Sequence, residues 1–309
     1  MSFLYFLESL RNPVLDAIFS FITLFGEETV FMAVGMIVFW CFSKNEGYYL
    51  LCVGFLGTAI NQFLKIVCRV PRPWVKNPDF TIVESAREAA SGYSFPSGHT
   101  QSSIGLFGGV ARWNKNKILR IVMIAMCVIV PFSRMYLGVH TPADVLVSVA
   151  IALVLIFVGY PLFNKAVRSP KMMYGIFGFL ALIMASYLCF VCFYDFPADI
   201  DMKNLESAQK NGFTLMGCIL GIFAVYTADI KWIKFETNAV WWAQIIKAVI
   251  GIGLVLAAKE LLKYPLNAIM PANTWARLVR YFLMVIIGGV IWPMTFKYFA
   301  KLGKKKEDN

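Results

Sequence analysis

Nine runs of apolar residues, each of spanning or near-spanning length, limit most strongly how this chain can fold. They lie at about residues 28–43, 47–68, 99–111, 118–133, 143–163, 172–194, 212–230, 238–258 and 279–296. A helix needs about 20 apolar residues to cross the hydrocarbon core of a bilayer, so these runs would use over half of the chain. The pattern predicts an all-α fold: a polytopic membrane helical bundle of about nine transmembrane helices.

The composition excludes the main classes of protein that work outside a membrane. Of 309 residues, 59% are hydrophobic and only 15% are charged, whereas ordinary soluble domains are about 25% charged. This excludes a cytosolic globular enzyme and a disordered chain. The net charge of +11 would suit a nucleic-acid partner, but the Lys and Arg residues lie in short gaps between apolar runs, as in loops that flank membrane helices. We therefore expect the lipid bilayer as a partner and no nucleic acid.

The distribution of basic residues predicts an orientation. Gaps near 44, 112–120, 163–171 and 231–236 fall on one side together with the C-terminal tail, and this side carries a modest excess of Lys and Arg, which favours the cytoplasm. The loop 69–98 and the turn near 134–142 then face outward, and we expect the cell (plasma) membrane. The tail residues Lys304, Lys305 and Lys306 either lie near anionic headgroups or are a solvated end.

Two segments predict interfacial elements, and the chain divides into two parts. Residues 1–26 form two short amphipathic pieces broken at Asn12-Pro13, which suits interfacial helices. Residues 259–278 are amphipathic and broken by Pro265 and Pro271. We expect a core at 1–165, and additional transmembrane helices at 166–309 that could shape a lipid channel, form a transport path or mediate a homo-oligomer.

The seven cysteines do not predict a metal centre. All lie in or at the edges of apolar runs, where Cys behaves as a small hydrophobic residue. Only Cys189 and Cys192 form a C-x-x-C pair, and no second pair completes a tetrahedral site. We expect neither a metal nor a cofactor.

Three polar segments between residues 65 and 144 carry the chemistry. The first holds Lys65, Arg72 and Pro73, the second runs from Ser94 to His99, and the third runs from Ser133 to Asp144. Both histidines of the chain lie in these segments. Lys65, Arg72 and Arg134 are cations at the ends of membrane helices, and a lone charge there costs several kcal/mol unless it is paired. No matching acids lie beside them, so an anion with several oxygens, such as phosphate, is the natural ligand.

The other groups suit phosphoryl transfer. Ser97 and Gly98 precede a helix start, whose free N–H groups bind anions, and Gly98 lets a ligand approach the backbone. Asp144 lies four residues after His140, close enough to accept its Nδ1–H and leave Nε2 with a free lone pair. His140 is then a nucleophile or base, and His99 is free to act as the acid.

Each of these signals has a simpler interpretation when taken alone. Thr141 and Asp144 have the spacing of a helix capping box, and Lys65 and Arg72 could be residues that snorkel to a bilayer face. The three segments gain their weight from occurring together, in order, on one predicted side of the membrane.

The combination of Lys65, Arg72 and Pro73, then Pro96, Ser97, Gly98 and His99, then Ser133, Arg134, His140 and Asp144 resembles the three-part signature of the type 2 phosphatidic acid phosphatase superfamily. The resemblance plainly covers residues 65–144. It implies a membrane helical bundle with an active site near the outer surface, and metal-independent hydrolysis of a phosphate ester or anhydride. It also implies that His140 attacks phosphorus and becomes phosphohistidine, that Asp144 orients it and that His99 protonates the leaving oxygen. Lys65, Arg72, Arg134, Ser97 and Gly98 would hold the phosphoryl oxygens.

A site at a membrane surface suits a phosphorylated lipid, and several substrates remain open. Undecaprenyl diphosphate, phosphatidate and phosphatidylglycerol phosphate all fit, and a sphingoid phosphate is the alternative. A lipid transporter or flippase that uses the basic cluster only to bind a headgroup is the rival function, but it has no use for an oriented histidine. Glu27 and Glu28 either bind a headgroup or mark the outer interface, and the second meaning is favoured.

Overall fold

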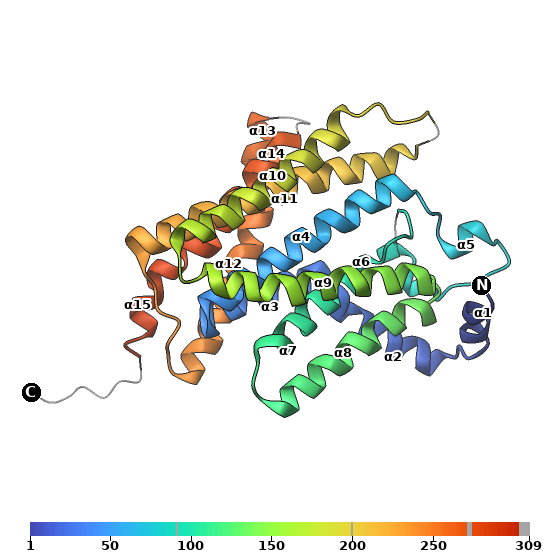
Figure 1. The fold of residues 1–309 in the computed structure, drawn as a ribbon, viewed down its shortest axis with the longest axis horizontal. Helices are drawn as coiled ribbons and strands as arrows, with labels where there is room; N and C mark the ends of the chain where they lie inside the picture. The colour runs from blue at the N-terminus through green and yellow to red at the C-terminus, as the bar shows by residue number, and fades with distance from the viewer. Residues whose placement is uncertain (91, 199, 271–273, 303–309) are drawn as a thin grey trace, which may run out of the picture. The chain divides into compact units, whose positions relative to one another are not determined.

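The computed structural model describes residues 1–90, 92–198, 200–270 and 274–302, and every regular element in these ranges is helical (Figure 1). The predicted all-α fold is thus confirmed. Six helices are long and apolar enough to cross a membrane: Lys44–Lys76, Lys117–Tyr136, Pro142–Ala166, Pro170–Phe193, Met202–Ile233 and Thr274–Phe299. This is an integral membrane protein with six candidate spans in the described residues.

A seventh candidate span is bent. It consists of Pro13–Gly26 and Glu28–Phe42, which meet at an angle of 53° and form either a broken span or a re-entrant loop. The predicted count of nine is not confirmed, because the runs at 99–111 and 238–258 do not fall on any of these candidates. The run at 99–111 divides into three short helices: α6 (Gly98–Ser103), η5 (Ile104–Gly108) and α7 (Gly109–Trp113).

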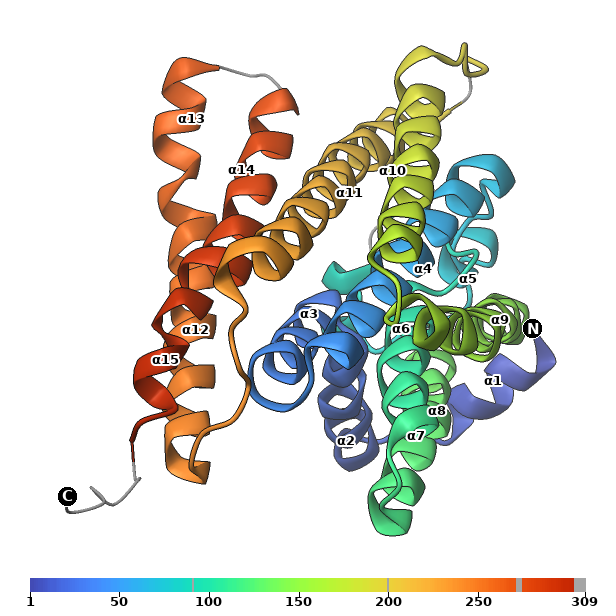
Figure 2. The same ribbon diagram turned by 60° about the vertical axis from the view of Figure 1, so that its left-hand side comes forward.

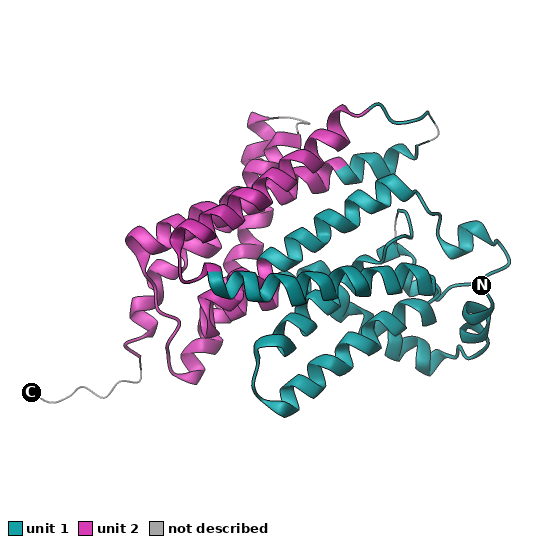
Figure 3. Ribbon diagram, viewed as in Figure 1, with its two compact units in different colours: residues 1–32, 52–165, 195–208 teal, residues 33–51, 166–194, 209–309 magenta. Residues whose placement is uncertain are grey.

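The chain forms two compact units (Figure 3). Unit 1 comprises residues 1–32, 52–165 and 195–208, and unit 2 comprises residues 33–51, 166–194 and 209–309. Four helices contribute residues to both units: α3 (Glu28–Ile37), α4 (Lys44–Cys68), α9 (Pro142–Ala166) and α11 (Met202–Ala228). The units therefore interleave along the sequence, and unit 1 includes a segment from the second half of the chain.

Unit 1 is organised around helix α8 (Lys117–Tyr136). It packs against α1 (Ser2–Ser9), α2 (Pro13–Thr23), α6 and α7, and it lies beside α2 in Figures 1 and 2. Its N-terminal part exposes apolar residues such as Ile118, Ile121 and Val128, as a helix in contact with lipid would. Its C-terminal turn is buried and ends at Arg134 and Tyr136. The helix thus carries one motif residue into the interior of unit 1.

Side-chain caps fix the starts of several helices in unit 1. The Asn12 side chain accepts hydrogen bonds from the amides of Val14 and Leu15, and Pro13 occupies the first helical position of α2. The break between α1 and α2 therefore falls where the sequence predicts it. Asn116 caps α8 in the same way through the amide of Leu119. These caps set the points at which the chain turns back into the bundle.

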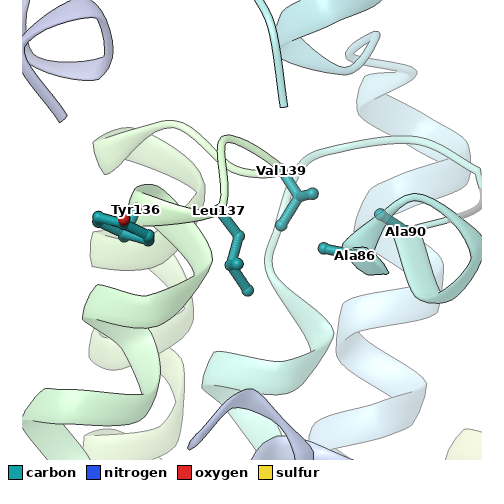
Figure 4. Close-up of a cluster of buried hydrophobic side chains, with 5 residues drawn as sticks. All are labelled: Ala86, Ala90, Tyr136, Leu137 and Val139. Atoms are coloured by element: carbon teal, nitrogen blue, oxygen red, sulfur yellow. The ribbon is translucent and has the colours of Figure 1, made fainter. Parts of the chain in front are cut away.

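The long loop 69–98 contains three short elements: α5 (Pro73–Lys76), η3 (Glu84–Ala86) and η4 (Glu88–Ala90). Figure 4 shows two alanines of η3 and η4 packed against the turn that follows α8. The cluster consists of Ala86, Ala90, Tyr136, Leu137 and Val139. A backbone hydrogen bond from Val83 to the Leu137 carbonyl (3.1 Å) adds to it. This packing fixes the turn that precedes helix α9 (Pro142–Ala166).

Unit 2 contains most of the second half of the chain. Its elements are η2 (Val38–Phe42), α10 (Pro170–Phe193), η6 (Asp229–Ile233), α12 (Trp241–Leu261), α13 (Lys263–Ile269), α14 (Thr274–Ile286), η7 (Ile287–Ile291), η8 (Pro293–Thr295) and α15 (Phe296–Phe299). Helix α12 packs against η2, α13, α14, η7 and α15. The Trp40 indole is fully buried and donates to the Gly288 carbonyl at 2.8 Å. Of the features predicted here, Pro271 and the lysines at 304–306 lie outside the described residues.

Candidate active site

The three polar segments meet inside unit 1. Lys65 lies in the last turn of α4, and Arg72 is the residue that precedes α5. Helix α6 begins after Ser97, which brings His99 into its first turn. Hydrogen bonds then join the segments directly: Arg72 contacts His140, and Ser94 contacts Asp144. Residues up to 68 positions apart in the sequence are therefore in direct contact.

His140 lies between a cation and a carboxylate and is only 1% exposed. Its Nε2 lies 3.0 Å from Arg72 Nη1, and its Nδ1 lies 3.5 Å from Asp144 Oδ2. An arginine can only donate, so Nε2 must accept from it and the ring proton belongs on Nδ1. The Nδ1 distance is longer than a normal hydrogen bond. The arrangement nevertheless selects the tautomer that gives Nε2 the lone pair.

Asp144 is held by its own helix start and by a serine. Its Oδ2 accepts hydrogen bonds from the Thr141 amide (2.7 Å) and from the Ser94 hydroxyl (2.6 Å). The Asp144 amide in turn lies 3.3 Å from Thr141 Oγ1, so the capping box at the start of α9 does form. Asp144 can cap the helix and lie beside His140 at the same time, because its Oδ2 faces both the Thr141 amide and His140 Nδ1.

Arg134 is a fully buried cation with spare donors. Its side chain is 0% exposed, and Nη1 donates to Thr23 Oγ1 at 2.7 Å. Its Nε and Nη2 have no hydrogen-bond partner among the described residues. Buried N–H groups in this state cost free energy, and more so when they carry charge. They are suited to the oxygens of an anion.

Arg72 and Lys65 add two more positive charges. Arg72 is 5% exposed, and it donates from Nε to the Gly92 carbonyl (2.9 Å) and from Nη1 to the Val139 carbonyl (3.0 Å). Lys65 takes part in no ion pair among the described residues. The cluster therefore carries a surplus of positive charge that an anionic ligand would offset.

The start of α6 is open to a ligand. Ser97 caps the helix through the Thr100 amide, at 3.4 Å, and its own amide donates to the Asp144 carbonyl at 3.2 Å. A Cβ atom added at Gly98 would find only Asn61 Oδ1 within 4 Å, at 3.8 Å. The space beside this backbone is thus left free, which supports the expectation that an anion approaches Gly98 closely.

The cations control the protonation of both histidines. Burial, followed by the charges of Arg134, Lys65 and Arg72, lowers the pKa of His99 to about 2. Burial and the same three cations also lower the pKa of His140 well below its ordinary value of 6.5. In the ligand-free site both imidazoles are therefore neutral at pH 7.

Two residues that hold the cluster have no sequence signal of their own. Thr23 holds Arg134 from 111 positions away, so no local spacing could have indicated it. Ser94 lies in the second polar segment, but its residue type alone did not predict a bond to Asp144. Ser133, in contrast, donates to the Val130 carbonyl within its own helix and supports that turn. Across the described ranges, no group of three or more His, Cys, Asp or Glu side chains could hold a metal ion.

Comparison with known proteins identifies a family for the chain. Residues 45–168 match the PAP2 superfamily, and residues 213–305 match the transmembrane extension of PAP2 superfamily phosphatases. Undecaprenyl-diphosphatase BcrC of Bacillus subtilis (strain 168) is 30% identical over 151 residues, which are 48% of this chain and 74% of the relative. Sphingosine-1-phosphate phosphatase 2 of Mus musculus is 24% identical over 82% of this chain and 74% of its own length.

A third relative, phosphatidylglycerophosphatase B of Bacillus subtilis (strain 168), is 26% identical over 48% of this chain and 75% of its own length. No solved structure matches the chain significantly. The first family match contains all three polar segments, and the second begins after residue 208, where the last segment of unit 1 ends.

Proposed function

This chain belongs to the PAP2 superfamily of phosphatases, and we propose that it hydrolyses a phosphate monoester or diphosphate on a membrane lipid through a phosphohistidine intermediate. The observation that carries this proposal is the position of His140, with Nε2 facing Arg72 and Nδ1 facing Asp144. The lone pair of His140 is then on Nε2, and the Asp144 carboxylate can stabilise the positive charge that the imidazole ring gains.

In the first step, the Nε2 lone pair of His140 attacks phosphorus. A P–N bond forms while the bond between phosphorus and the leaving oxygen breaks, and His99 gives its proton to that oxygen. The leaving oxygen belongs to the lipid alcohol in a monoester and to the remaining lipid phosphate in a diphosphate. In the ligand-free structure Arg72 Nη1 donates to Nε2. Before the attack, this donor must therefore move from Nε2 to a phosphoryl oxygen. Arg134 and Lys65 neutralise the remaining phosphoryl charge, with help from Ser97 and the Gly98 amide. Asp144 stabilises the positive imidazole ring.

In the second step, water attacks the phosphohistidine. His99 takes a proton from this water while the water oxygen bonds to phosphorus. The P–N bond breaks, its electron pair returns to His140 Nε2, and inorganic phosphate leaves. His99 must be protonated before the first step, although its pKa is about 2 in the empty site. The negative charges of the bound phosphate offset the three cations, so we propose that His99 gains its proton together with the substrate.

The substrate is a lipid that keeps its chain in the bilayer while its phosphate enters the site. Undecaprenyl diphosphate, phosphatidate, phosphatidylglycerol phosphate and a sphingoid phosphate all meet this description. The names of the three relatives include three of these chemical types. A panel of the four lipids, assayed by phosphate release, identifies the substrate.

The test of the mechanism uses purified protein in detergent with a metal chelator present. We expect phosphate release to persist under chelation, His140→Ala to abolish it, and vanadate to inhibit it competitively. A quench during turnover should trap acid-labile phosphate on His140 in the wild type. Full activity of His140→Ala, or loss of activity on chelation, would overturn the mechanism. Headgroup binding without phosphate release from any lipid would instead favour a transporter.

We also propose that the site faces outward at the plasma membrane and that the basic C-terminal tail is cytoplasmic. The modest excess of Lys and Arg in the loops near 112–120 and 163–171 supports this orientation. An epitope added to the C-terminus should be cleaved by protease only after the cells are permeabilised. Cleavage in intact cells would reverse the orientation.

A further inference from the structure

A buried asparagine of helix α4 faces the first residue of helix α6. Asn61 lies in an apolar part of α4 and is only 2% exposed. A Cβ atom added at Gly98 would lie 3.8 Å from Asn61 Oδ1, and no side chain from any other segment of the chain would lie within 4 Å of it. Helix α6 also packs against α8 and the short helix η1 (Leu24–Gly26). The amide of Asn61 therefore borders the free space beside Gly98.

A second contact shows which face of α4 meets α6. One turn before Asn61, a Cβ atom at Gly57 would lie 2.7 Å from Gln101 Nε2. Gly57, Asn61 and Lys65 follow one another at intervals of four residues, so they lie on one face of α4. Gly98 and Gln101 are three residues apart and share one face of α6. Asn61 thus lies on the face of α4 that carries Lys65, one turn away from it.

The Asn61 side chain has a donor that makes no hydrogen bond. Its Nδ2 is buried and has no partner among the described residues. An asparagine in a membrane helix ordinarily hydrogen-bonds to a neighbouring helix, and a buried amide without such a bond costs free energy. Packing between helices therefore does not explain an asparagine at this position. A ligand that accepts a hydrogen bond from Nδ2 would explain it.

The phosphate of the substrate would supply the missing acceptor. Lys65 and Gly98 are two of the groups proposed above to hold the phosphoryl oxygens, and Asn61 lies one turn from the first and faces the second. The two ends of an amide have nearly the same shape, so a turn of about 180° would bring Nδ2 to the place where Oδ1 faces Gly98. An anion in this space would favour the nitrogen, because an oxygen there could only repel it.

We propose that Asn61 is a further phosphate-binding residue, which turns its amide when the substrate enters and donates from Nδ2 to a phosphoryl oxygen beside Gly98. A hydrogen bond to such a charged acceptor is about twice as strong as a neutral one. Because the amide carries no charge, it adds a donor without a fourth cation that would disfavour protonation of His99. This inference rests on the proposed phosphatase function and adds a residue from outside the three polar segments.

The experiment separates binding from folding and uses vanadate as the probe. Asn61→Leu keeps the approximate shape of the side chain and removes the donor. We expect vanadate affinity and kcat/KM to fall about ten- to a hundredfold, the value of a hydrogen bond to a charged group. The apparent Tm of the ligand-free protein in detergent should stay the same or rise, because an unpartnered amide is no longer buried. A purely structural role would give the opposite result, a lower Tm with unchanged vanadate affinity.

A second variant and a control complete the test. Asn61→Asp keeps the size of the side chain and replaces Nδ2 by an oxygen, so it should weaken vanadate binding at least as much as Asn61→Leu. Gln101→Met is the matched control, because it removes another buried amide, 4% exposed, that meets α4 at Gly57 and not at Asn61. Its vanadate affinity should equal that of the wild type.

Wild-type vanadate affinity in either Asn61 variant would overturn the proposal, as would an equal loss in Gln101→Met. If Asn61→Leu does not fold, the vanadate affinity of Asn61→Asp decides in the same way. In each of these cases a wild type that binds vanadate and releases phosphate from a lipid remains a phosphatase. A wild type that does neither would instead refute the proposed function.

Discussion

At the scale of single residues, three cations determine how the two histidines behave. Burial, followed by the charges of Lys65, Arg72 and Arg134, lowers the pKa of both His99 and His140, so the two side chains stay neutral in the folded, ligand-free protein. In the unfolded chain the same histidines titrate near the ordinary value of 6.5. The unfolded state therefore binds more protons below pH 6.5, and stability must fall as the pH falls through that value.

This difference predicts an acid-sensitive fold. Below pH 6.5 both histidines should lower the stability as the pH falls, and His99 should do so by at most about 1.4 kcal/mol per pH unit until the pH approaches 2. The apparent Tm in detergent, measured without ligand from pH 7.5 to pH 5, should decline less steeply in His99→Gln than in the wild type. Identical slopes would show that His99 is not held neutral by the cations.

The spare donors of Arg134 predict that charge alone is insufficient at this position. Arg134→Lys keeps a cation but removes Nε and Nη2, so kcat/KM should fall about ten- to a hundredfold and vanadate should inhibit less well. The control is Arg112→Lys, because Arg112 is exposed and lies over the ring of Tyr160, outside the site. An unchanged kcat/KM in Arg134→Lys would mean that the two nitrogens do not meet the phosphate.

The sequence could predict contacts between site residues that are close together in the chain, but not contacts between residues that are far apart. His140 and Asp144 are four residues apart at a helix start, so their proximity follows from helical geometry. Thr23 and Arg134 are joined only by the packing of α2 against α8.

At the scale of elements, hydropathy overestimates the number of spans. The run at 99–111 begins with Thr100, Gln101, Ser102 and Ser103, all buried inside unit 1. Their burial comes from packing of α6 against α8 and η1 and does not need a lipid environment. A sliding window of hydropathy detects the apolar residues that follow, but the helical stretch 98–113 is too short to cross the hydrocarbon core. For the bent pair α2–α3 hydropathy makes the opposite error and misses part of a candidate span, because the first half alone is too short to indicate one.

The segment 195–208 belongs to unit 1 and contacts the loop that holds Arg72. Gly92 has a φ of +77°, its carbonyl accepts from Arg72, and a Cβ atom there would lie 2.5 Å from Asn204 Oδ1. The Asp201 amide lies 3.4 Å from the Tyr93 hydroxyl oxygen. An element of the second half of the chain thus supports a site residue of the first half.

Substitution of Gly92 tests this support. Gly92→Ala should lower kcat/KM strongly, because alanine at this φ costs about 1–2 kcal/mol and its Cβ collides with Asn204. Adding Asn204→Ala should restore part of the loss by removing the collision, while the backbone cost remains. The measurement is kcat/KM for the single and double variants. A double variant no better than Gly92→Ala alone would place the damage entirely in the backbone.

At the scale of the whole molecule, the two units alternate along the chain. A division of the chain directly after the first family match, at residue 168, would therefore separate unit 1 into two pieces. Unit 1 needs residues 195–208, which lie beyond the superfamily match at 45–168. The predicted division of the sequence at residue 165 stays a prediction, and the compact units share the helices α3, α4, α9 and α11.

A fragment that ends at residue 168 should therefore be inactive, because it lacks the segment that supports Gly92. Co-expression with a fragment of residues 169–309 should restore phosphate release, and the two fragments should co-purify in detergent. The measurement is activity per mole of the first fragment. Wild-type activity of the first fragment alone would show that residues 195–208 are dispensable.

The hydrogen bond between Arg72 Nη1 and His140 Nε2 also has a consequence for chemical reactivity at rest. While the guanidinium occupies that lone pair, neutral electrophiles such as acylating reagents meet a shielded nitrogen. Only an oxyanion that attracts the arginine exposes it. The enzyme should thus resist histidine-directed labelling when idle, and covalent inhibitors against it should carry a phosphate-like group that unmasks the target before they react.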